Sequence, residues 1–353
     1  MNKIDEYLRA ALKLNASDLH FVSGDPVRTR VHGGLQVLME EKLAVATVEE
    51  AMFEIMDGTT QLAFEREESA DFAYEIPDVS RFRINVFRHL NGIGAIFRAI
   101  PSKALTLEEL SMPAVIHNLC KQNSGMILVT GKTGSGKSTT LAAMIDAINK
   151  SMQGHILTIE DPIEFVHTTK SSLISQREIG LHSGSFAEAL RSALREDPDV
   201  ILVGEMRDLE TISIAVTAAE MGILVMGTLH TNGAAQTVDR IINSFPADKQ
   251  SHIRTMISTS LRGVVSQQLL PTKHKPGRIA ALEVLINTTA VANLIRQGKL
   301  DQLETAMQSG GNVGMQTMDS ALMDLVEKAF VSGHEAYKQS NNKSKFERLR
   351  NED

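Results

Sequence analysis

The sequence is poor in the residues on which several classes of protein depend. It has one cysteine, Cys120, no tryptophan and 4% aromatic residues. A single cysteine excludes an internal disulfide framework and any zinc site built from several cysteines, and we expect Cys120 to be a small buried hydrophobic residue. Every apolar run is shorter than 18 residues, which predicts no membrane-spanning helix. Asp5 and Glu6 stand where a signal peptide needs basic and then apolar residues, so export is not expected.

Basic residues are also in deficit, because the formal net charge is -7. A chain of this charge has no overall attraction to the phosphate backbone of nucleic acids. The remaining composition, 42% hydrophobic over 353 residues, provides enough core for two globular domains. The composition therefore predicts a two-domain, soluble, cytoplasmic protein.

The first hundred residues predict a small mixed α/β domain. Two β-prone segments, Val27–Val31 and Leu35–Leu38, flank a tight turn and are typical of a hairpin. Thr47 and Glu50 form a capping box that predicts the start of a helix. Three more strands are expected, the second with Phe82, Ile84 and Val86 on one face and Arg81, Arg83 and Asn85 on the other, at Asp71–Ile76, Arg81–Phe87 and Ile93–Ile100.

Two prolines bracket the connector Pro101–Pro113, which contains a short capped turn at Thr106–Glu109. After this connector, strands alternate with helices. Apolar runs without alternation suit strands that are buried on both faces of a parallel sheet. The four such runs are Met126–Thr130, Ile156–Ile159, Val200–Val203 and Ile223–Leu229.

Helices are expected between these strands and after them. One begins at the capping box of Ser185 and Glu188. Past Pro246 we expect one long helical stripe, then a strand at Ile279–Ile286 and two or three further helices. The polar, charged tail from Ser332 predicts a loosely packed end. The residues of the stripe are Ile253, Met256, Ile257, Leu261, Val264 and Val265.

A phosphate-binding loop follows the first of the four apolar runs. Residues 131–138 read GKTGSGKS and match the pattern G-x-x-x-x-G-K-[ST]. The glycines let consecutive N–H groups point at phosphate oxygens, and the helix N-terminus adds partial positive charge. Lys137 would reach the β- and γ-phosphates of ATP, and Ser138 would ligate Mg²⁺. We therefore expect ATP or ADP with Mg²⁺, bound by Gly131, Thr133, Gly134, Ser135, Gly136, Lys137, Ser138 and Thr139.

The other three apolar runs also end in polar side chains. Glu160, Asp161 and Glu164 follow the second run, Glu205 follows the third, and His230 follows the fourth. Ligands of doubly wound sheets bind beyond the carboxyl ends of the strands. This convergence predicts a hydrolytic site and not merely a passive nucleotide pocket.

Charge and position indicate a role for each of these side chains. Glu205 is placed to hold Mg²⁺ or its water shell, and Glu164 is the candidate base that orients and deprotonates the attacking water. The reverse assignment of the two glutamates stays open. Glu160 and Asp161 are expected to support the loop, and His230 to donate to the γ-phosphate.

Hydrolysis also needs positive charge on the transferring phosphoryl group, usually from an arginine. For each arginine the alternative is a solvated surface position. Arg81 and Arg83, on one face of the small domain, could close over a nucleotide held by the other domain and so couple hydrolysis to domain movement. The candidates are Arg191, Arg195 and Arg207, close to the Glu205 strand in sequence, and Arg81, Arg83 and Arg98 of the N-terminal sheet.

Taken together, these motifs resemble those of the type IV pilus retraction (twitching motility) ATPases of the secretion-ATPase superfamily. The resemblance begins at ASDLH (16–20) and runs almost to the C-terminus. It includes the Walker A loop GKTGSGKST (131–139), the aspartate box ILTIEDPIEF (156–165), an atypical Walker B segment ALREDPDVILVGEMRDLET (193–211) and the histidine box GTLHTNGA (227–234). The segment AVANLIRQ (290–297) stands where this family has its retraction-associated motif, and departs from the commonest form at Ala292. Gly204 stands where most P-loop enzymes have Asp, as is usual in this family.

The resemblance implies an α/β protein in four parts: a PAS-like α+β N-terminal domain (1–100), a linker (101–117), a RecA-like P-loop ATPase core (118–289) and a C-terminal helical subdomain with a tail (290–353). It implies an ATP-hydrolysing homohexamer whose sites are completed by arginines of the N-terminal domain or of a neighbouring subunit. The ring would dock on an inner-membrane pilus platform protein, at the cytoplasmic face, and would act indirectly on pilin to retract the filament. Neither nucleic acid nor zinc is expected.

Three alternatives remain. Pilus-assembly and type II secretion ATPases are similar in the motor domain, but they typically carry an additional N-terminal domain and a four-cysteine zinc site, and neither is expected in this chain. An accessory retraction ATPase would keep similar motifs and turn ATP over slowly. A RecA-like nucleic-acid motor would need basic, aromatic-bearing loops, which the composition does not favour.

Overall fold

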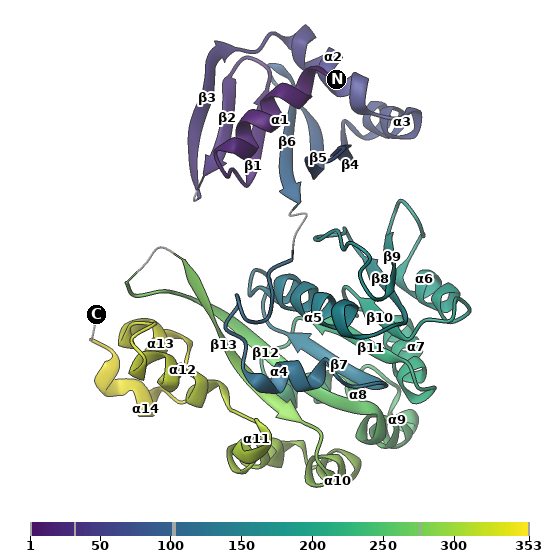
Figure 1. Ribbon diagram of the computed structural model, residues 1–353, viewed down its shortest axis with the longest axis vertical. Coiled ribbons are helices and arrows are strands. Elements are labelled where there is room, and N and C mark those ends of the chain that lie inside the picture. Colours follow the sequence, from purple (N-terminus) through teal and green to yellow (C-terminus); the bar gives the residue numbers. More distant parts are fainter. Residues whose placement is uncertain (1, 32, 101–103, 275–276, 352–353) are drawn as a thin grey trace. The chain divides into compact units, whose positions relative to one another are not determined.

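The chain divides into two compact units, residues 1–103 and 104–353, each with its own sheet (Figure 1). A computed structural model describes residues 2–31, 33–100, 104–274 and 277–351. The mixed α/β class is as the sequence predicts. Among the described residues, none of the helices has the length and apolar character needed to cross a bilayer.

The first unit is a six-stranded antiparallel sheet in the order β3-β2-β1-β6-β5-β4, packed against helices. The predicted hairpin and the three later strands are all present. Alternation along β5 is confirmed, because Phe82, Ile84 and Val86 are buried while Arg83 is exposed on the other face. The elements are α1 (Lys3–Lys13), β1 (Asp18–Val22), β2 (Pro26–Val31), β3 (Gly34–Lys42), α2 (Val45–Ile55), α3 (Gly58–Glu67), β4 (Ser69–Ile76), β5 (Ser80–His89) and β6 (Gly92–Ile100).

The start of α2 differs from the prediction. The helix begins at Val45 after the extended N-cap residue Ala44, so Thr47 lies inside the first turn and the predicted capping box is wrong. Val48 and Met52 are fully buried against the sheet. The packing of this apolar face, which is stronger than a cap contribution of about 1 kcal/mol, sets where the helix lies.

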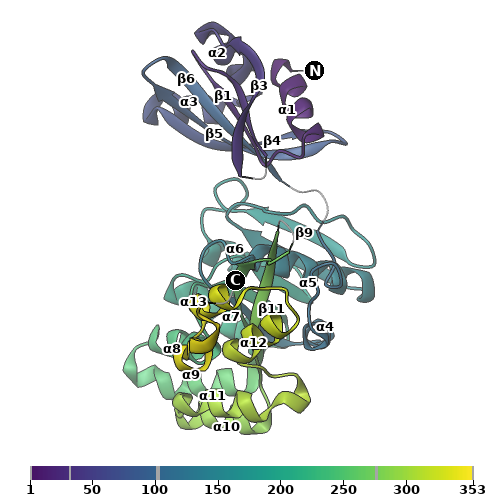
Figure 2. The same cartoon turned by 90° about the vertical axis from the view of Figure 1, so that its left-hand side faces the viewer.

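The second unit is a seven-stranded sheet in the order β13-β12-β7-β11-β10-β8-β9. The four predicted apolar runs form the neighbouring parallel strands β7, β11, β10 and β8. Helices α4 and α5 cover one face and α6 to α9 the other, which buries these strands on both sides (Figure 2). The strands are β7 (Gly125–Thr130), β8 (His155–Glu160), β9 (Leu173–Glu178), β10 (Val200–Val203), β11 (Leu224–Leu229), β12 (Leu261–Pro271) and β13 (Arg278–Ile286). The helices are α4 (Ala114–Leu119), α5 (Lys137–Ser151), α6 (Phe186–Ala193), α7 (Leu209–Glu220), α8 (Ala234–Asn243), α9 (Ala247–Ser260), α10 (Thr289–Gln297), α11 (Leu303–Ser309), α12 (Met318–Glu327), α13 (Gly333–Gln339) and α14 (Lys343–Phe346), with 3-10 turns at Leu300–Gln302, Gly311–Val313 and Glu347–Leu349.

The connector before this sheet begins outside the described residues, at 101–103. Its predicted capped turn is confirmed, because the backbone N–H of Thr106 donates to Oε2 of Glu109 at 2.7 Å and the Glu109 N–H donates to Oγ1 of Thr106 at 3.2 Å. Cys120, just after α4, is buried as expected, and burial raises the pKa of its thiol to about 12.

The long helical stripe predicted after Pro246 is wrong in its second half. Helix α9 ends at Ser260, and Leu261, Val264 and Val265 belong to strand β12. β12 pairs in parallel with β7 and antiparallel with β13, so it is a buried internal strand. Short apolar runs have the same appearance in a buried strand and in a buried helix, and the β-branched pair of valines was the signal for the strand.

The C-terminal tail is also better packed than predicted. Residues after Ser332 form α13 and α14, and Phe346 is fully buried in a cluster with Leu322 and Val331 that packs on β12 and β13. Oγ of Ser332 caps α13 by accepting from the N–H of Glu335 at 3.2 Å. This S-x-x-E pattern is a helix-start signal that the prediction overlooked.

Candidate active site

The phosphate-binding loop joins β7 to α5. Gly131, Gly134 and Gly136 have φ values of +139°, +80° and +87°, which side chains with a β-carbon rarely adopt. At Gly131 there is also no room, since a β-carbon would come within 2.3 Å of the Gln267 carbonyl oxygen. The loop closes around Lys137, whose Nζ donates to the carbonyl oxygens of Gly131 (2.9 Å) and Lys132 (3.1 Å). Burial lowers the pKa of Lys137, while the nearby carboxylate of Glu205 acts in the opposite direction.

The side chain of Gln267, on β12, holds the phosphate-binding loop against the sheet. Its Nε2 donates to the carbonyl oxygen of Ser135 at 2.7 Å, and its Oε1 accepts from Oγ1 of Thr140 at 2.7 Å. Gln267 is buried, so both bonds are shielded from water. One amide therefore fixes the loop and the first turn of α5 to the sheet. The sequence prediction missed this residue because it placed the segment in a helix.

A cluster of charged side chains lies at the carboxyl ends of β10 and β11. His230 Nε2 lies 2.8 Å from Oε1 of Glu205, and Arg207 Nη2 donates to Oε2 of Glu205 at 2.6 Å. Burial acts to raise the pKa of Glu205, but Arg207 and His230 together hold it below its ordinary value. Glu205 is thus an ionised, half-buried carboxylate that interacts electrostatically with Lys137. Of the predicted site residues, the structure brings the nucleotide-binding Lys137 and the catalytic candidates Glu205, Arg207 and His230 together.

A small cavity lies beneath Ser138 of the loop. Its volume is about 30 Å³, close to that of one water molecule, and Ser138, Glu160, His167 and Thr228 are among the residues that line it. Burial raises the pKa of Glu160. The predicted Mg²⁺ ligands are Ser138, which lines this cavity, and Glu205, whose charged form is favoured by Arg207 and His230. A hydroxyl and a carboxylate are the hard oxygen ligands that Mg²⁺ prefers, so these two residue types fit the predicted cation.

The segment that carries Glu164 is fixed at both ends. The Glu164 N–H donates to Oε2 of Glu160 at 3.3 Å, in keeping with the supporting role expected for Glu160. At the other end, the buried Asn149 of α5 donates to the Thr168 carbonyl at 2.8 Å and accepts from the Lys170 N–H at 3.1 Å. The Glu164 side chain itself is exposed. Asn149 was not predicted to take part in the site, because a polar residue inside a helix usually faces water.

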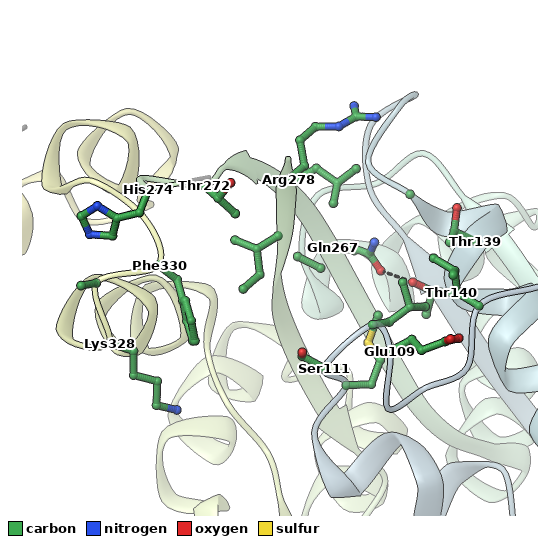
Figure 3. A pocket seen from close by; sticks show the side chains of 18 residues that line it. Glu109, Ser111, Thr139, Thr140, Gln267, Thr272, His274, Arg278, Lys328 and Phe330 are labelled. Carbon is green, nitrogen blue, oxygen red and sulfur yellow. Dashed lines mark hydrogen bonds between the residues drawn. The ribbon is translucent and has the colours of Figure 1, made fainter. Parts of the chain in front are cut away.

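A larger cavity of about 620 Å³ adjoins the loop within the second unit (Figure 3). Gly136 and Thr139 form one wall, and apolar side chains from β12, β13 and the Leu105–Met112 segment form much of the rest. His274 and Lys328 add polar groups at the side opposite Thr139, and Arg278 lies at the upper edge in this view (Figure 3). The size and lining match those of ligand pockets in general.

The candidate arginines are distributed over both units. Arg81 and Arg83 lie on β5 of the first unit, where Arg83 Nε is 4.0 Å from Oδ1 of Asp71. Arg98 on β6 is the cross-strand partner of Arg83, and its Nε bonds Oδ1 of Asp18 at 2.9 Å. In the second unit, Arg191 forms an ion pair with Glu210, and the exposed Arg195 donates to the Arg191 carbonyl at 3.2 Å. Of the candidates, Arg207 contacts the charged cluster around Glu205 directly.

Comparisons with known proteins agree over nearly the whole chain. A family model described as type II/IV secretion system protein matches residues 1–337. The chain is 50% identical, over 94% of its length and 96% of the relative, to the type IV pilus retraction ATPase PilT of Pseudomonas aeruginosa. It is 49% identical, over 93% of its length and 90% of the relative, to the twitching motility protein of Neisseria gonorrhoeae. A crystal structure of the pilus retraction motor PilT with bound ADP is similar with a TM-score of 0.92 and 41% identity, over 99% of this chain and 100% of that one.

Proposed function

The chain belongs to the family of type II/IV secretion system proteins and, within it, to the pilus retraction ATPases, and we propose that it is a motor that hydrolyses ATP to retract a type IV pilus. The meeting of Lys137, Glu205 and His230 at one edge of the sheet carries this proposal. These groups supply a cation for phosphate oxygens, a carboxylate and a hydrogen-bond donor within one site.

In the proposed mechanism, Lys137 leaves the carbonyl oxygens of its own loop and binds the β- and γ-phosphates. Ser138 and Glu205 would hold Mg²⁺, directly or through water, and the cation would supply positive charge that neutralises the phosphates. Glu164 accepts a proton from the attacking water, at its exposed carboxylate. His230 donates a hydrogen bond to the γ-phosphate. Because His230 also bonds to Glu205, release of that phosphate would change the positions of both side chains. Thr133 and Thr139 complete the loop around the nucleotide.

The cavity beside the loop is the proposed pocket for the base and the ribose. It begins at Gly136 and Thr139, where the phosphate chain ends, and its apolar walls suit a purine ring. Ser111 and Met112 in its wall belong to the connector Pro101–Pro113. Nucleotide exchange in this pocket would therefore act on the segment that leads to the first unit.

We further propose the fold names and the assembly that the family resemblance implies. The first unit would be the PAS-like domain, and the second the RecA-like core followed by its helical subdomain. Six subunits would form a ring in which Arg81 and Arg83, or Arg195 of a neighbour, complete each site. The ring would act on pilin through a platform protein at the inner face of the cytoplasmic membrane.

Steady-state ATP hydrolysis, measured against protein concentration with light scattering in parallel, tests the motor. Activity should rise steeply as rings of about six subunits form, because a neighbour completes the site. Equal specific activity in the monomer would refute completion in trans. Arg81→Ala should slow hydrolysis while both units stay folded, and an unchanged rate would place Arg81 on a solvated face.

Retraction itself is tested in a piliated strain that lacks its own retraction ATPase, by following fluorescently labelled pili. The intact chain should restore retraction, and Glu164→Gln should not. Fast turnover of purified protein without restored retraction would favour another role in the family. Slow turnover that Glu164→Gln leaves unchanged would identify an accessory ATPase.

A further inference from the structure

A buried carboxylate on β13 connects two helices that lie far apart in sequence. Glu283 is 5% exposed. Its Oε1 accepts from the backbone N–H of Ala234, the first residue of α8, at 2.6 Å, and its Oε2 accepts from the N–H of Met318, the first residue of α12, at 3.3 Å. The positive ends of two helix dipoles therefore meet at one side chain.

Glu283 thus forms a bridge between Ala234 and Met318. On the α8 side, this bridge holds the segment that follows His230. Ser266 lies opposite Glu283 across β12 and β13, and its Oγ accepts from the N–H of Gly233 at 2.9 Å. Two neighbouring side chains of the sheet thus bind two consecutive amides, only three and four residues after the histidine. A movement of His230 would therefore be transmitted to Glu283 through the few residues that separate His230 from Ala234.

On the α12 side, the bridge holds the start of the C-terminal helices. Gln316 exchanges both backbone hydrogen bonds with Val284, at 2.9 and 3.1 Å, and its Nε2 donates to the Leu282 carbonyl at 2.7 Å. Helix α12 packs against β13 and belongs to the cluster that contains α13 and α14 (Figure 1). The position of Met318 therefore determines where these helices lie on the sheet.

We propose that Glu283 is a positioning residue that couples the His230 segment to the C-terminal helices. This inference rests on the proposed function, since His230 must respond to the γ-phosphate. One carboxylate shared by two amides cannot follow a shift of Ala234 without weakening its bond to Met318 or moving α12 with it. Burial raises the pKa of Glu283, while the bonds from Ala234 and Met318 favour its charged form, so the bridge is stable only while both amides are in place.

Hydrogen exchange of the full chain, with and without β,γ-imido-ATP, tests the coupling. In the unaltered protein, the analogue should slow exchange in residues 131–140 and change exchange in residues 233–238 and 316–322. Glu283→Gln keeps the size of the side chain but replaces one acceptor by an N–H group, so only one of the two bonds survives. That variant should keep the response of residues 131–140 and lose the response of residues 316–322.

Asp319→Asn is the matched control. Asp319, on α12, is also a buried carboxylate, and its hydrogen bonds within the described part of the chain come from the backbone N–H groups of Asn341 (2.8 Å) and Asn342 (3.0 Å), between α13 and α14. The Asp319→Asn variant should be less thermally stable, and residues 316–322 should still change their hydrogen exchange when the analogue binds. A retained response in Glu283→Gln, or its equal loss in Asp319→Asn, would overturn the coupling.

A second readout separates positioning from simple loss of stability. Glu283→Gln should lower kcat about tenfold with KM nearly unchanged, at a temperature where the variant is fully folded. An unaltered kcat would overturn the inference. Absence of any response at residues 131–140 in the unaltered protein would instead refute nucleotide binding, and with it the proposed function.

Discussion

Replacement of Gln267 by leucine tests how the phosphate loop is held. Leucine fills a similar volume but removes the buried bonds to the Ser135 carbonyl and to the Thr140 hydroxyl. A buried polar group left without a partner costs about 1–3 kcal/mol. The Thr140 hydroxyl can turn to the Gly136 carbonyl of its own helix, so only the Ser135 carbonyl stays unsatisfied. We therefore expect a loss of about 1–3 kcal/mol in the free energy of unfolding.

The same substitution should weaken nucleotide binding, because the loop must then be ordered by the ligand. Binding of a fluorescent ATP analogue and urea unfolding, measured on the same preparation, give both quantities. Gln268→Leu is the matched control, since Gln268 points to the other face of β12 and its Oε1 is a buried atom with no hydrogen-bond partner among the described residues. The control should bind the analogue normally and be at least as stable. Normal affinity in Gln267→Leu would refute the argument that Gln267 orders the loop.

Three further substitutions test individual groups of the site. Lys137→Ala should weaken binding of a labelled ATP analogue about 10- to 100-fold through loss of charge-assisted hydrogen bonds, and normal retention would exclude the phosphate loop as the binding site. Glu164→Gln should leave binding intact and slow turnover by roughly 10²–10⁴-fold, whereas near-normal turnover would move the role of the base to Glu205. Burial lowers the pKa of His167 below its ordinary value of 6.5, so the unfolded chain takes up the proton first and stability should fall as pH drops through about 6.5. His167→Gln should lose less stability in urea unfolding between about pH 7 and pH 5.5, and an equal loss in both proteins would assign the acid sensitivity to other groups.

The elements that the sequence predicted are those with a local signal. The four buried runs, the glycine pattern of residues 131–138 and the Ser185 cap of α6 each occupy a few adjacent residues, and all are found as expected. Strand β9 was not predicted, because Leu173 is exposed and the strand lies at the sheet edge with little apolar character. β12 was assigned to a helix, because its pairing with β7 joins segments about 135 residues apart and the β-branched pair Val264 and Val265 was its one local signal.

The error in β12 explains which site residues were missed. The catalytic side chains that were predicted lie at the carboxyl ends of strands, where ligands of doubly wound sheets bind. The groups that hold them stand inside strands: Ser266 and Gln267 are consecutive on β12, so their side chains point to opposite faces of the sheet. One binds the segment after His230 and the other binds the phosphate loop. A polar pair inside an apolar strand is costly unless both members have partners, and here that cost is offset by bonds to two parts of the same site. Because Glu283 pairs with Ser266 across the sheet, this cross-strand pair joins the histidine segment to the C-terminal helices, and the adjacent Gln267 holds the phosphate loop from the other face.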